Sequence, residues 1–251
     1  MKKMVVFVEG GTESSFVEKL LLEIAGEKNI RIQKHKSRGG GKYRKTTSLV
    51  GKSGETGITK YFARIVDCGG DERVRSVLVE NYTSLCSEKF EMIIGLRDVR
   101  GDVEGEKRTF ADVPRVGRWM SHGVPTTPIK PLFILAVMET EAWFLAEHTH
   151  FARINPSITL DSAITAIGCD LSTENIEHRP TPAEDLDLIY RTAGERYLSD
   201  TSSSGKKCPK DRALIQRTID VLDFAEIYGG SISDRVSHIK PLIEAVDFFL
   251  S

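Results

Sequence analysis

The stretch MVVFVEGGTESSFVEKLL, residues 4–21, holds the strand, turn and helix that decide the fold. Five apolar residues end at Glu9, and a pair of glycines follows at once. An apolar run of this length, bounded by turn residues, is typical of a strand buried on both faces of a parallel sheet. Beyond the glycines, Phe16, Leu20 and Ile24 recur at helical spacing, which predicts a helix.

The same pattern of an apolar run ending in acid occurs twice more. EMIIGLRD ends at Asp98, and PLFILAVMETE ends at Glu139 and Glu141. Parallel strands place their carboxyl ends at one edge of a sheet, where open α/β sheets bind ligands. We therefore expect carboxylates from distant parts of the chain to meet there. Carboxylates gathered in this way need a cation, and a set of oxygen ligands suits Mg²⁺ or Mn²⁺.

The order of the segments predicts the fold class. Strands alternate with helices as far as about residue 150, which favours an α/β fold with a mostly parallel sheet flanked by helices. Amphipathic helical segments follow, one of them over residues 211–228. We expect an α/β domain over residues 1–150 and a helical C-terminal part over residues 151–251 that packs on the core. The segment of residues 36–57 is rich in glycine and cations and is predicted to be a surface loop.

The composition is that of a globular protein, with 40% hydrophobic residues, 28% charged residues and a formal net charge of −1. This balance excludes a globally basic nucleic-acid coat but allows a local basic patch. No apolar run approaches the roughly 18 residues that span a bilayer, so we expect no membrane partner. The four cysteines are scattered, with no CxxC pair. They are predicted to be reduced thiols in a cytoplasmic protein.

Three motifs carry a resemblance to a known family. VEGGTESSFVEKLL resembles the opening of Toprim domains, and IIGLRDVRGD resembles the acidic turn after a later strand of that fold. VMETEAWFLAE is similar to a third acidic motif in a Toprim-like family related to the OLD nucleases. The resemblance covers about residues 1–150. It implies a Toprim-like fold and a nuclease that cleaves phosphodiester bonds with Mg²⁺ or Mn²⁺. Members of the broader group often accompany ATPases in phage defence, so a separate ATPase subunit is also implied.

The resemblance also implies roles for individual acids. Glu9 corresponds to the Toprim glutamate, a metal ligand or general acid/base, and Asp98 to the first metal-binding aspartate. The usual Asp-x-Asp pattern is replaced here by Asp98-Val99-Arg100, and the next acid is Asp102. An acid from the third motif would supply the missing carboxylate. The expected catalytic residues are Glu9, Asp98 and Glu139. The expected metal ligands are Glu9, Asp98, Asp102, Glu139 and Glu141.

A basic segment indicates a nucleic-acid substrate, with DNA preferred to RNA. Cations interleaved with glycines can follow a phosphate backbone without reading its sequence. The alternative is that these cations only solvate a flexible loop. A homodimer is also compatible with the sequence. The expected nucleic-acid-binding residues are Lys36, Arg38, Lys42, Arg44 and Lys45.

Two other functions stay open. The departure from Asp-x-Asp motivates a non-catalytic subunit that binds nucleic acid or an ATPase through a degenerate site. The same carboxylates could also serve a phosphohydrolase of small phosphorylated molecules. His148 and His150 are two residues apart on a helical end and do not share a face, so we interpret them as surface residues rather than a metal pair.

Overall fold

The computed structural model describes residues 1–40, 43–70, 72–100, 108–199 and 209–251. Within these ranges one sheet has six strands in the order β3-β2-β4-β1-β5-β6. The strands are β1 (Lys2–Val8), β2 (Ile30–Gly40), β3 (Tyr43–Gly54), β4 (Tyr61–Asp67), β5 (Met92–Asp98) and β6 (Leu132–Ala136).

Three of the described helices lie between strands, and the other seven follow the last strand. The first three, α1 (Gly11–Ala25), α2 (Arg73–Ser87) and α3 (Val113–Ser121), lie among the strands. The remaining helices are α4 (Glu141–Ala146), α5 (His150–Ile154), α6 (Leu160–Ile167), α7 (Pro182–Arg191), α8 (Arg212–Val221), α9 (Phe224–Gly229) and α10 (Lys240–Leu250). Short 3-10 turns lie at Phe110–Asp112, Ile176–His178 and Ser237–Ile239. None of the helices in the described ranges is both long and apolar enough to cross a membrane.

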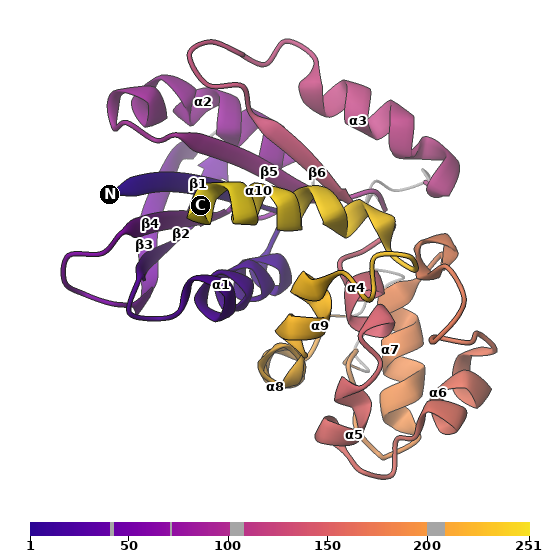
Figure 1. The fold of residues 1–251 in the computed structure, drawn as a ribbon. Coiled ribbons are helices and arrows are strands. Elements are labelled where there is room, and N and C mark those ends of the chain that lie inside the picture. The colour runs from indigo at the N-terminus through magenta and orange to yellow at the C-terminus, as the bar shows by residue number, and fades with distance from the viewer. Residues whose placement is uncertain (41–42, 71, 101–107, 200–208) are drawn as a thin grey trace. The chain divides into compact units, whose positions relative to one another are not determined.

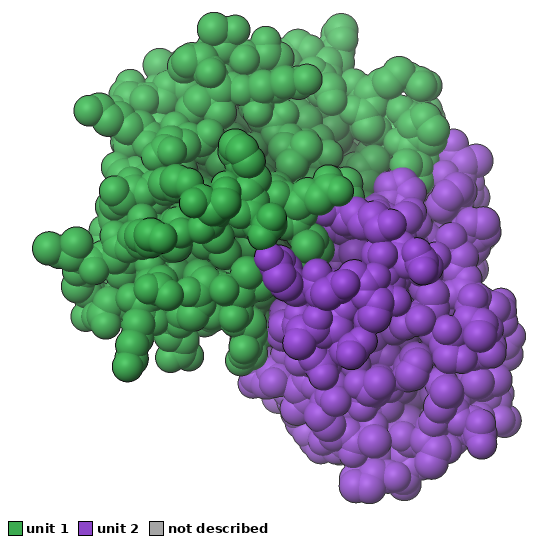
Figure 2. All heavy atoms as spheres, viewed as in Figure 1, with its two compact units in different colours: residues 1–98, 113–135, 241–251 green, residues 99–112, 136–240 purple. Residues whose placement is uncertain are grey.

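The chain divides into two compact units, coloured separately in Figure 2. Unit 1 consists of residues 1–98, 113–135 and 241–251, and unit 2 of residues 99–112 and 136–240. The last helix, α10, thus belongs to the same unit as the first strand. The predicted domains over residues 1–150 and 151–251 stay a prediction.

Unit 1 is a layered α/β structure. Strand β1 pairs in parallel with β4 and β5, β2 pairs in parallel with β4, and β3 pairs antiparallel with β2. Helices α1 and α10 cover one face of the sheet, and α2 and α3 lie over the other (Figure 1). The apolar residues of β1 are buried, as a strand covered on both faces requires. The predicted α/β fold with a mostly parallel sheet and a helical C-terminal region is confirmed.

The predicted surface loop over residues 36–57 is wrong for most of its length. Residues Ile30–Gly40 and Tyr43–Gly54 form a β-hairpin, paired from Arg31 opposite Gly54 to Gly40 opposite Tyr43. The glycines and cations of this segment favour a loop, but its β-branched residues Thr46, Thr47 and Val50 favour extended backbone. Pairing with β2 satisfies the backbone groups along one edge of β3, and that pairing is not visible in the local sequence.

Unit 2 is helical in its described residues. The predicted helix over residues 211–228 is two helices, because α8 ends at Val221 and α9 starts at Phe224. Asp223 lies between them in an extended conformation and caps α9. Its Oδ1 accepts the backbone N–H groups of Ala225 and Glu226 at 3.0 and 3.1 Å.

Candidate functional site

Glu9 and Asp98 meet at the carboxyl ends of two neighbouring strands. Glu9 directly follows β1, Asp98 ends β5, and these strands pair in parallel. Glu9 Oε1 accepts a hydrogen bond from the backbone N–H of Asp98 at 2.7 Å. Both residues are mostly buried, with 8% and 4% of their surfaces exposed. The sequence prediction that these two acids converge at one edge of the sheet is therefore matched by their geometry.

A buried cation lies beside this pair. Arg97 Nε is 4.0 Å from Glu9 Oε1 and donates a hydrogen bond to the carbonyl of Asp98 at 3.2 Å. Its guanidinium lies over the ring of Trp119 on α3, 4.9 Å from the ring centroid. Arg97 itself is 1% exposed. A fixed positive charge at this position offsets part of the charge of the carboxylates, because a buried charge needs a partner.

A third acid at this edge was missed by sequence reasoning. Asp67 ends β4, lies in register with Val8 and is buried. Its Oδ1 accepts the N–H of Gly69 at 2.8 Å, and its Oδ2 is 2.9 Å from Lys36 Nζ. The signal was present, because YFARIVD is also an apolar run that ends in acid.

The neighbouring cysteine is not an activated nucleophile. Burial, followed by the negative charge of Asp67, raises the pKa of the Cys68 thiol to about 12, although the Arg73 guanidinium opposes this shift. The thiol is therefore protonated at neutral pH, and the thiolate is the reactive form.

The start of α1 lies next to the same strand end. Glu13 Oε2 accepts the backbone N–H of Gly10 at 2.9 Å, and the carbonyl of Glu9 accepts the N–H of Gly70 at 2.9 Å. The first contact closes the turn between β1 and α1, and the second joins it to the segment after β4. The backbone around Glu9 is thus held from both sides.

Glu139 and Glu141 lie in unit 2, where each has its own partners. Glu139 Oε1 is 3.3 Å from the guanidinium of Arg100, and its Oε2 accepts the N–H of Ala183 at 3.0 Å. Ala183 is in the first turn of α7, so the Glu139 carboxylate also complements the positive end of that helix. The predicted metal and catalytic roles of Glu139 stay predictions, and its described partners suit a structural role.

Glu141 is also fully buried. Its Oε1 accepts hydrogen bonds from the hydroxyl of Tyr197, at 2.8 Å, and from Lys210 Nζ. These partners differ from those of Glu139, as expected for acids two residues apart at a helix start. The residue before them, Met138, has a φ of 59°, a left-handed conformation that is uncommon without glycine.

The predicted nucleic-acid-binding residues lie on the hairpin. Lys36 and Arg38 are on β2, and Arg38 is exposed. Arg44 and Lys45 are on β3, although their side chains lie outside the described part of the structure. Lys42 and the predicted ligand Asp102 also lie outside the described residues.

The donor set limits which cation the site could hold. Among the residues that the structure describes, no group of three or more His, Cys, Asp and Glu side chains could hold a metal ion. Mg²⁺ usually keeps several waters and is bound through one or two carboxylates together with substrate phosphates. Glu9 and Asp98 therefore fit Mg²⁺ bound in that manner, and they do not fit a cation that requires a complete cage of protein ligands.

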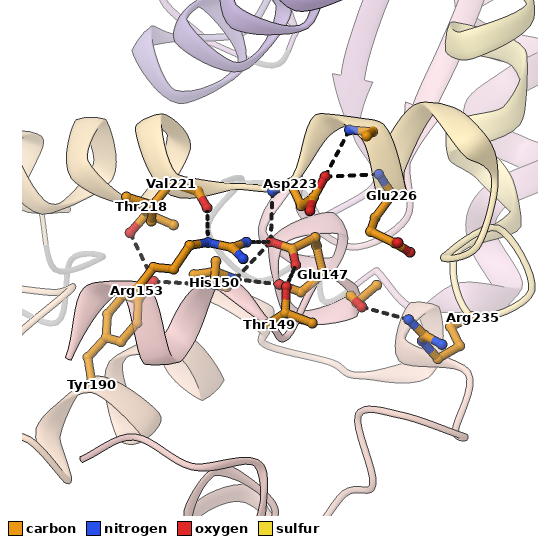
Figure 3. Close-up of polar contacts among 12 residues, drawn as sticks. Glu147, Thr149, His150, Arg153, Tyr190, Thr218, Val221, Asp223, Glu226 and Arg235 are labelled. Atoms are coloured by element: carbon orange, nitrogen blue, oxygen red, sulfur yellow. Dashed lines mark hydrogen bonds and ion pairs between the residues drawn. The ribbon is translucent and has the colours of Figure 1, made fainter. Parts of the chain in front are cut away.

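A second polar cluster lies in unit 2 (Figure 3). His150 Nε2 is 2.9 Å from the hydroxyl of Tyr190, which is 2.9 Å from Thr218 Oγ1. These three residues are fully buried. The prediction that His150 is a surface residue is wrong, because tertiary packing encloses the short helix α5. Burial lowers the pKa of His150 to about 3, so the ring is neutral at physiological pH.

Glu147 completes this cluster, as Figure 3 shows. It is 3.1 Å from the guanidinium of Arg153 and accepts the N–H of Asp223 at 3.1 Å. Burial raises the pKa of Glu147, although hydrogen bonds from Thr149 and Asp223 act against the shift. Because its members are buried and bonded to one another, the cluster stabilises unit 2 rather than presenting groups to a substrate.

Comparison of the chain with protein-family models, with curated proteins and with solved structures finds no match.

Proposed function

We propose that this chain is a Toprim-like nuclease that cleaves phosphodiester bonds of DNA with Mg²⁺ or Mn²⁺ bound at Glu9 and Asp98. The observation that carries the proposal is the 2.7 Å hydrogen bond that joins the Glu9 carboxylate to the backbone of Asp98. It brings together two acids that 88 residues of sequence separate. The ordered resemblance of the three acidic motifs to Toprim-like proteins supports the same function.

Each residue of the proposed site would have its own role in cleavage. A divalent cation held at this site would neutralise the phosphate and favour attack by water. The water oxygen would bond to phosphorus as the bond from phosphorus to the leaving oxygen breaks, and the leaving oxygen would take up a proton from solvent. Glu9 and Asp98 would hold that cation, and a carboxylate within hydrogen-bond reach of the water would take its proton. Arg97 would stay in place and offset one negative charge. The sequence also predicts a catalytic role for Glu139, and Glu139→Gln tests that role separately from those of Glu9 and Asp98.

The proposed partners follow from the resemblance. A separate ATPase subunit would regulate cleavage, and the pair would act in defence against foreign DNA. Purification of the tagged chain from its native cells, under mild conditions, tests this point. ATP hydrolysis that co-purifies with the chain supports the ATPase partner, and its absence at full recovery of the chain contradicts it.

The first experiment is calorimetric titration of the chain with Mg²⁺ and Mn²⁺. We expect binding that is lost in both Glu9→Gln and Asp98→Asn. Glutamine retains an oxygen that can accept the N–H of Asp98, so Glu9→Gln removes the charge while keeping this contact. Glu23→Gln is the matched control, because Glu23 is an exposed acid on α1. We also expect the native chain and the control to cleave DNA and the two site variants not to cleave it. This result would support a nuclease site at Glu9 and Asp98.

The second candidate is a non-catalytic subunit with a degenerate site. It is favoured by Arg97, which places a guanidinium 4.0 Å from Glu9 where a cation would otherwise offset the acid. In this case the native chain binds DNA or an ATPase, does not cleave, and binds equally well after Glu9→Gln. Metal-dependent cleavage by the native chain would exclude this candidate. A panel of phosphomonoesters and nucleotides separates both candidates from a small-molecule phosphohydrolase.

A further inference from the structure

The β2–β3 hairpin extends past the end of its neighbouring strand. Pairing between β2 and β4 ends where Lys36 lies opposite Asp67. Pairing between β2 and β3 continues through Arg38 opposite Thr46 to Gly40 opposite Tyr43. Because β2 is parallel to β4, this distal part projects from the carboxyl edge of the unit 1 sheet. The same edge carries Glu9 and Asp98.

One face of the hairpin is lined by cations and small polar groups. Side chains two residues apart on a strand lie on the same face, about 6.6 Å apart. This places Lys34, Lys36 and Arg38 in a row along β2. Directly opposite Lys36 and Arg38 on β3 are Ser48 and Thr46, which are exposed. We call these four residues, Lys36, Arg38, Thr46 and Ser48, the ribbon face.

The cations of this row differ in their surroundings. Lys34 Nζ is 2.6 Å from Glu18 on α1, and Lys36 Nζ is 2.9 Å from Asp67. Arg38 lies farther out, beyond the last residue of β4, and is exposed. Among these three cations, the positive charge thus becomes less compensated toward the projecting end.

The chemistry of the ribbon face suits a DNA duplex. Lysine, arginine, serine and threonine side chains all donate hydrogen bonds to phosphate oxygens. The major groove of B-DNA is about 12 Å wide and admits a two-stranded β-ribbon. Single-stranded nucleic acid is held largely by stacking on aromatic rings, and none of the four described residues of the ribbon face is aromatic. The deep, narrow major groove of A-form RNA excludes a ribbon of this kind.

We propose that the β2–β3 hairpin binds double-stranded DNA by entering its major groove, with the ribbon face against the phosphates that border the groove. The inference rests on the proposed function for its ligand and adds to it the form of DNA and the element that holds it. A duplex bound there would be presented to the edge where Glu9 and Asp98 lie.

The test measures DNA affinity separately from cleavage. Fluorescence anisotropy in a chelator reports the binding of a short DNA duplex, its single strand and an RNA duplex of the same sequence. We expect the DNA duplex to bind most tightly. Arg38→Gln and Lys36→Gln should each weaken it severalfold and reduce the slope of log affinity against log salt by about 0.9, the value for one phosphate contact. Lys28→Gln is the matched control, because this exposed lysine precedes β2 at the opposite edge of the sheet.

Groove-specific competitors identify the binding mode. Methyl green, which binds the major groove, should displace the chain, whereas distamycin, which binds the minor groove, should not. Thermal unfolding of each variant checks that the fold is kept, and Arg38 is suited to this because it is exposed. Single-strand binding as tight as duplex binding, or displacement by distamycin alone, overturns the proposal.

The two proposals fail in different ways. If the chain binds DNA but Arg38→Gln and Lys36→Gln bind as tightly as the native chain, the ribbon proposal fails and the nuclease proposal is unaffected. If DNA binds through the hairpin and no divalent cation supports cleavage, the nuclease proposal fails while the ribbon proposal stands. If no nucleic acid binds at all, both fail.

Discussion

Arg97 connects three features of unit 1 at the scale of single residues. It is buried, it lies over Trp119, and its Nε is 4.0 Å from Glu9. Its positive charge stabilises the Glu9 carboxylate and at the same time opposes the arrival of a second cation. Both effects follow from Coulomb interaction in a poorly solvated site.

Removal of this charge should make unit 1 depend on metal. We expect Arg97→Met to bind Mg²⁺ about tenfold more tightly, since a like charge nearby is removed. We also expect Mg²⁺ to raise its unfolding temperature by more than that of the native chain, because the cation becomes the partner of Glu9. Calorimetry and thermal scans with and without Mg²⁺ measure both effects. Arg97→Lys retains the charge and is the control; an equal rise in affinity in the two variants would contradict the electrostatic explanation.

The lowered pKa of the buried His150 predicts how the stability of unit 2 depends on pH. Burial lowers the pKa of His150 from an ordinary value of 6.5 to about 3, so the unfolded chain binds a proton that the folded chain excludes. Stability is therefore lost as the pH falls below the unfolded value. At about pH 5 the loss is about 2 kcal/mol, at 1.36 kcal/mol for each pH unit below 6.5.

Urea unfolding of the native chain and of His150→Gln at neutral and acidic pH isolates this effect. The raised pKa of Glu147 acts in the opposite direction, because its folded form takes up a proton more readily as the pH falls. His150 Nδ1 lies 3.6 Å from Glu147 Oε2, so the same comparison in a Glu147→Gln background removes this contribution. The native chain should lose more stability on acidification than the variant does, and equal losses would refute a buried neutral His150.

At the scale of elements, the hairpin depends on one glycine. Gly54 ends β3 with a φ of 71°, and a Cβ built there would lie 2.2 Å from the carbonyl oxygen of Ile30. A Cβ at Gly51 on the same strand would instead meet the flexible end of Lys34 at 3.0 Å, and Gly51 needs no positive φ. Glycine is therefore required at position 54, which lies opposite Arg31 at the base of the hairpin.

Alanine substitution at these two glycines should give different results. We expect Gly54→Ala to lower the free energy of unfolding by about 2 kcal/mol or more, since left-handed backbone alone costs a residue with a side chain about 1–2 kcal/mol. Gly51→Ala should change it by less than about 1 kcal/mol, the usual difference between glycine and alanine in a strand. Denaturant unfolding measures both, and similar losses at the two positions would contradict this interpretation.

At the scale of the whole molecule, the end of the chain completes the unit in which the chain begins. Phe249 on α10 is 3% exposed, and its ring centroid is 5.4 Å from that of Tyr61 on β4. The Tyr61 hydroxyl also donates a hydrogen bond to the carbonyl of Leu250. Unit 1 therefore includes the last eleven residues, and a fragment that ends near residue 150 lacks one helix that covers the sheet.

Substitution of two adjacent phenylalanines on α10 tests whether this helix packs on the sheet of unit 1. Phe249→Ala should lower the free energy of unfolding by about 3–5 kcal/mol, as is usual when a buried aromatic side chain is removed. Phe248→Ala is the matched control, because Phe248 is 74% exposed, and it should have little effect. Equal effects would show that α10 does not pack on the sheet as described.

Much of the fold could be predicted because its signals are local. The run of residues 4–8 is apolar at every position, and a strand covered on both faces buries all of it. The same rule, that an apolar run ending in acid marks the end of a buried strand, also identifies Asp67, which was not predicted. The hairpin was missed for the opposite reason. Residues 43–54 carry mixed local signals, and pairing with β2 decides their conformation.

The sequence by itself determined the α/β class, the helical C-terminal region and the positions where strands end in acid, because these depend on the periodicity of neighbouring residues. Only the tertiary structure decided that Glu9 accepts the N–H of Asp98, that Arg97 lies beside them, and that His150 is enclosed. These contacts join residues far apart in the chain, or depend on which elements pack together. Hydrogen bonding and burial act through space, so their outcome is fixed only when the elements have become neighbours.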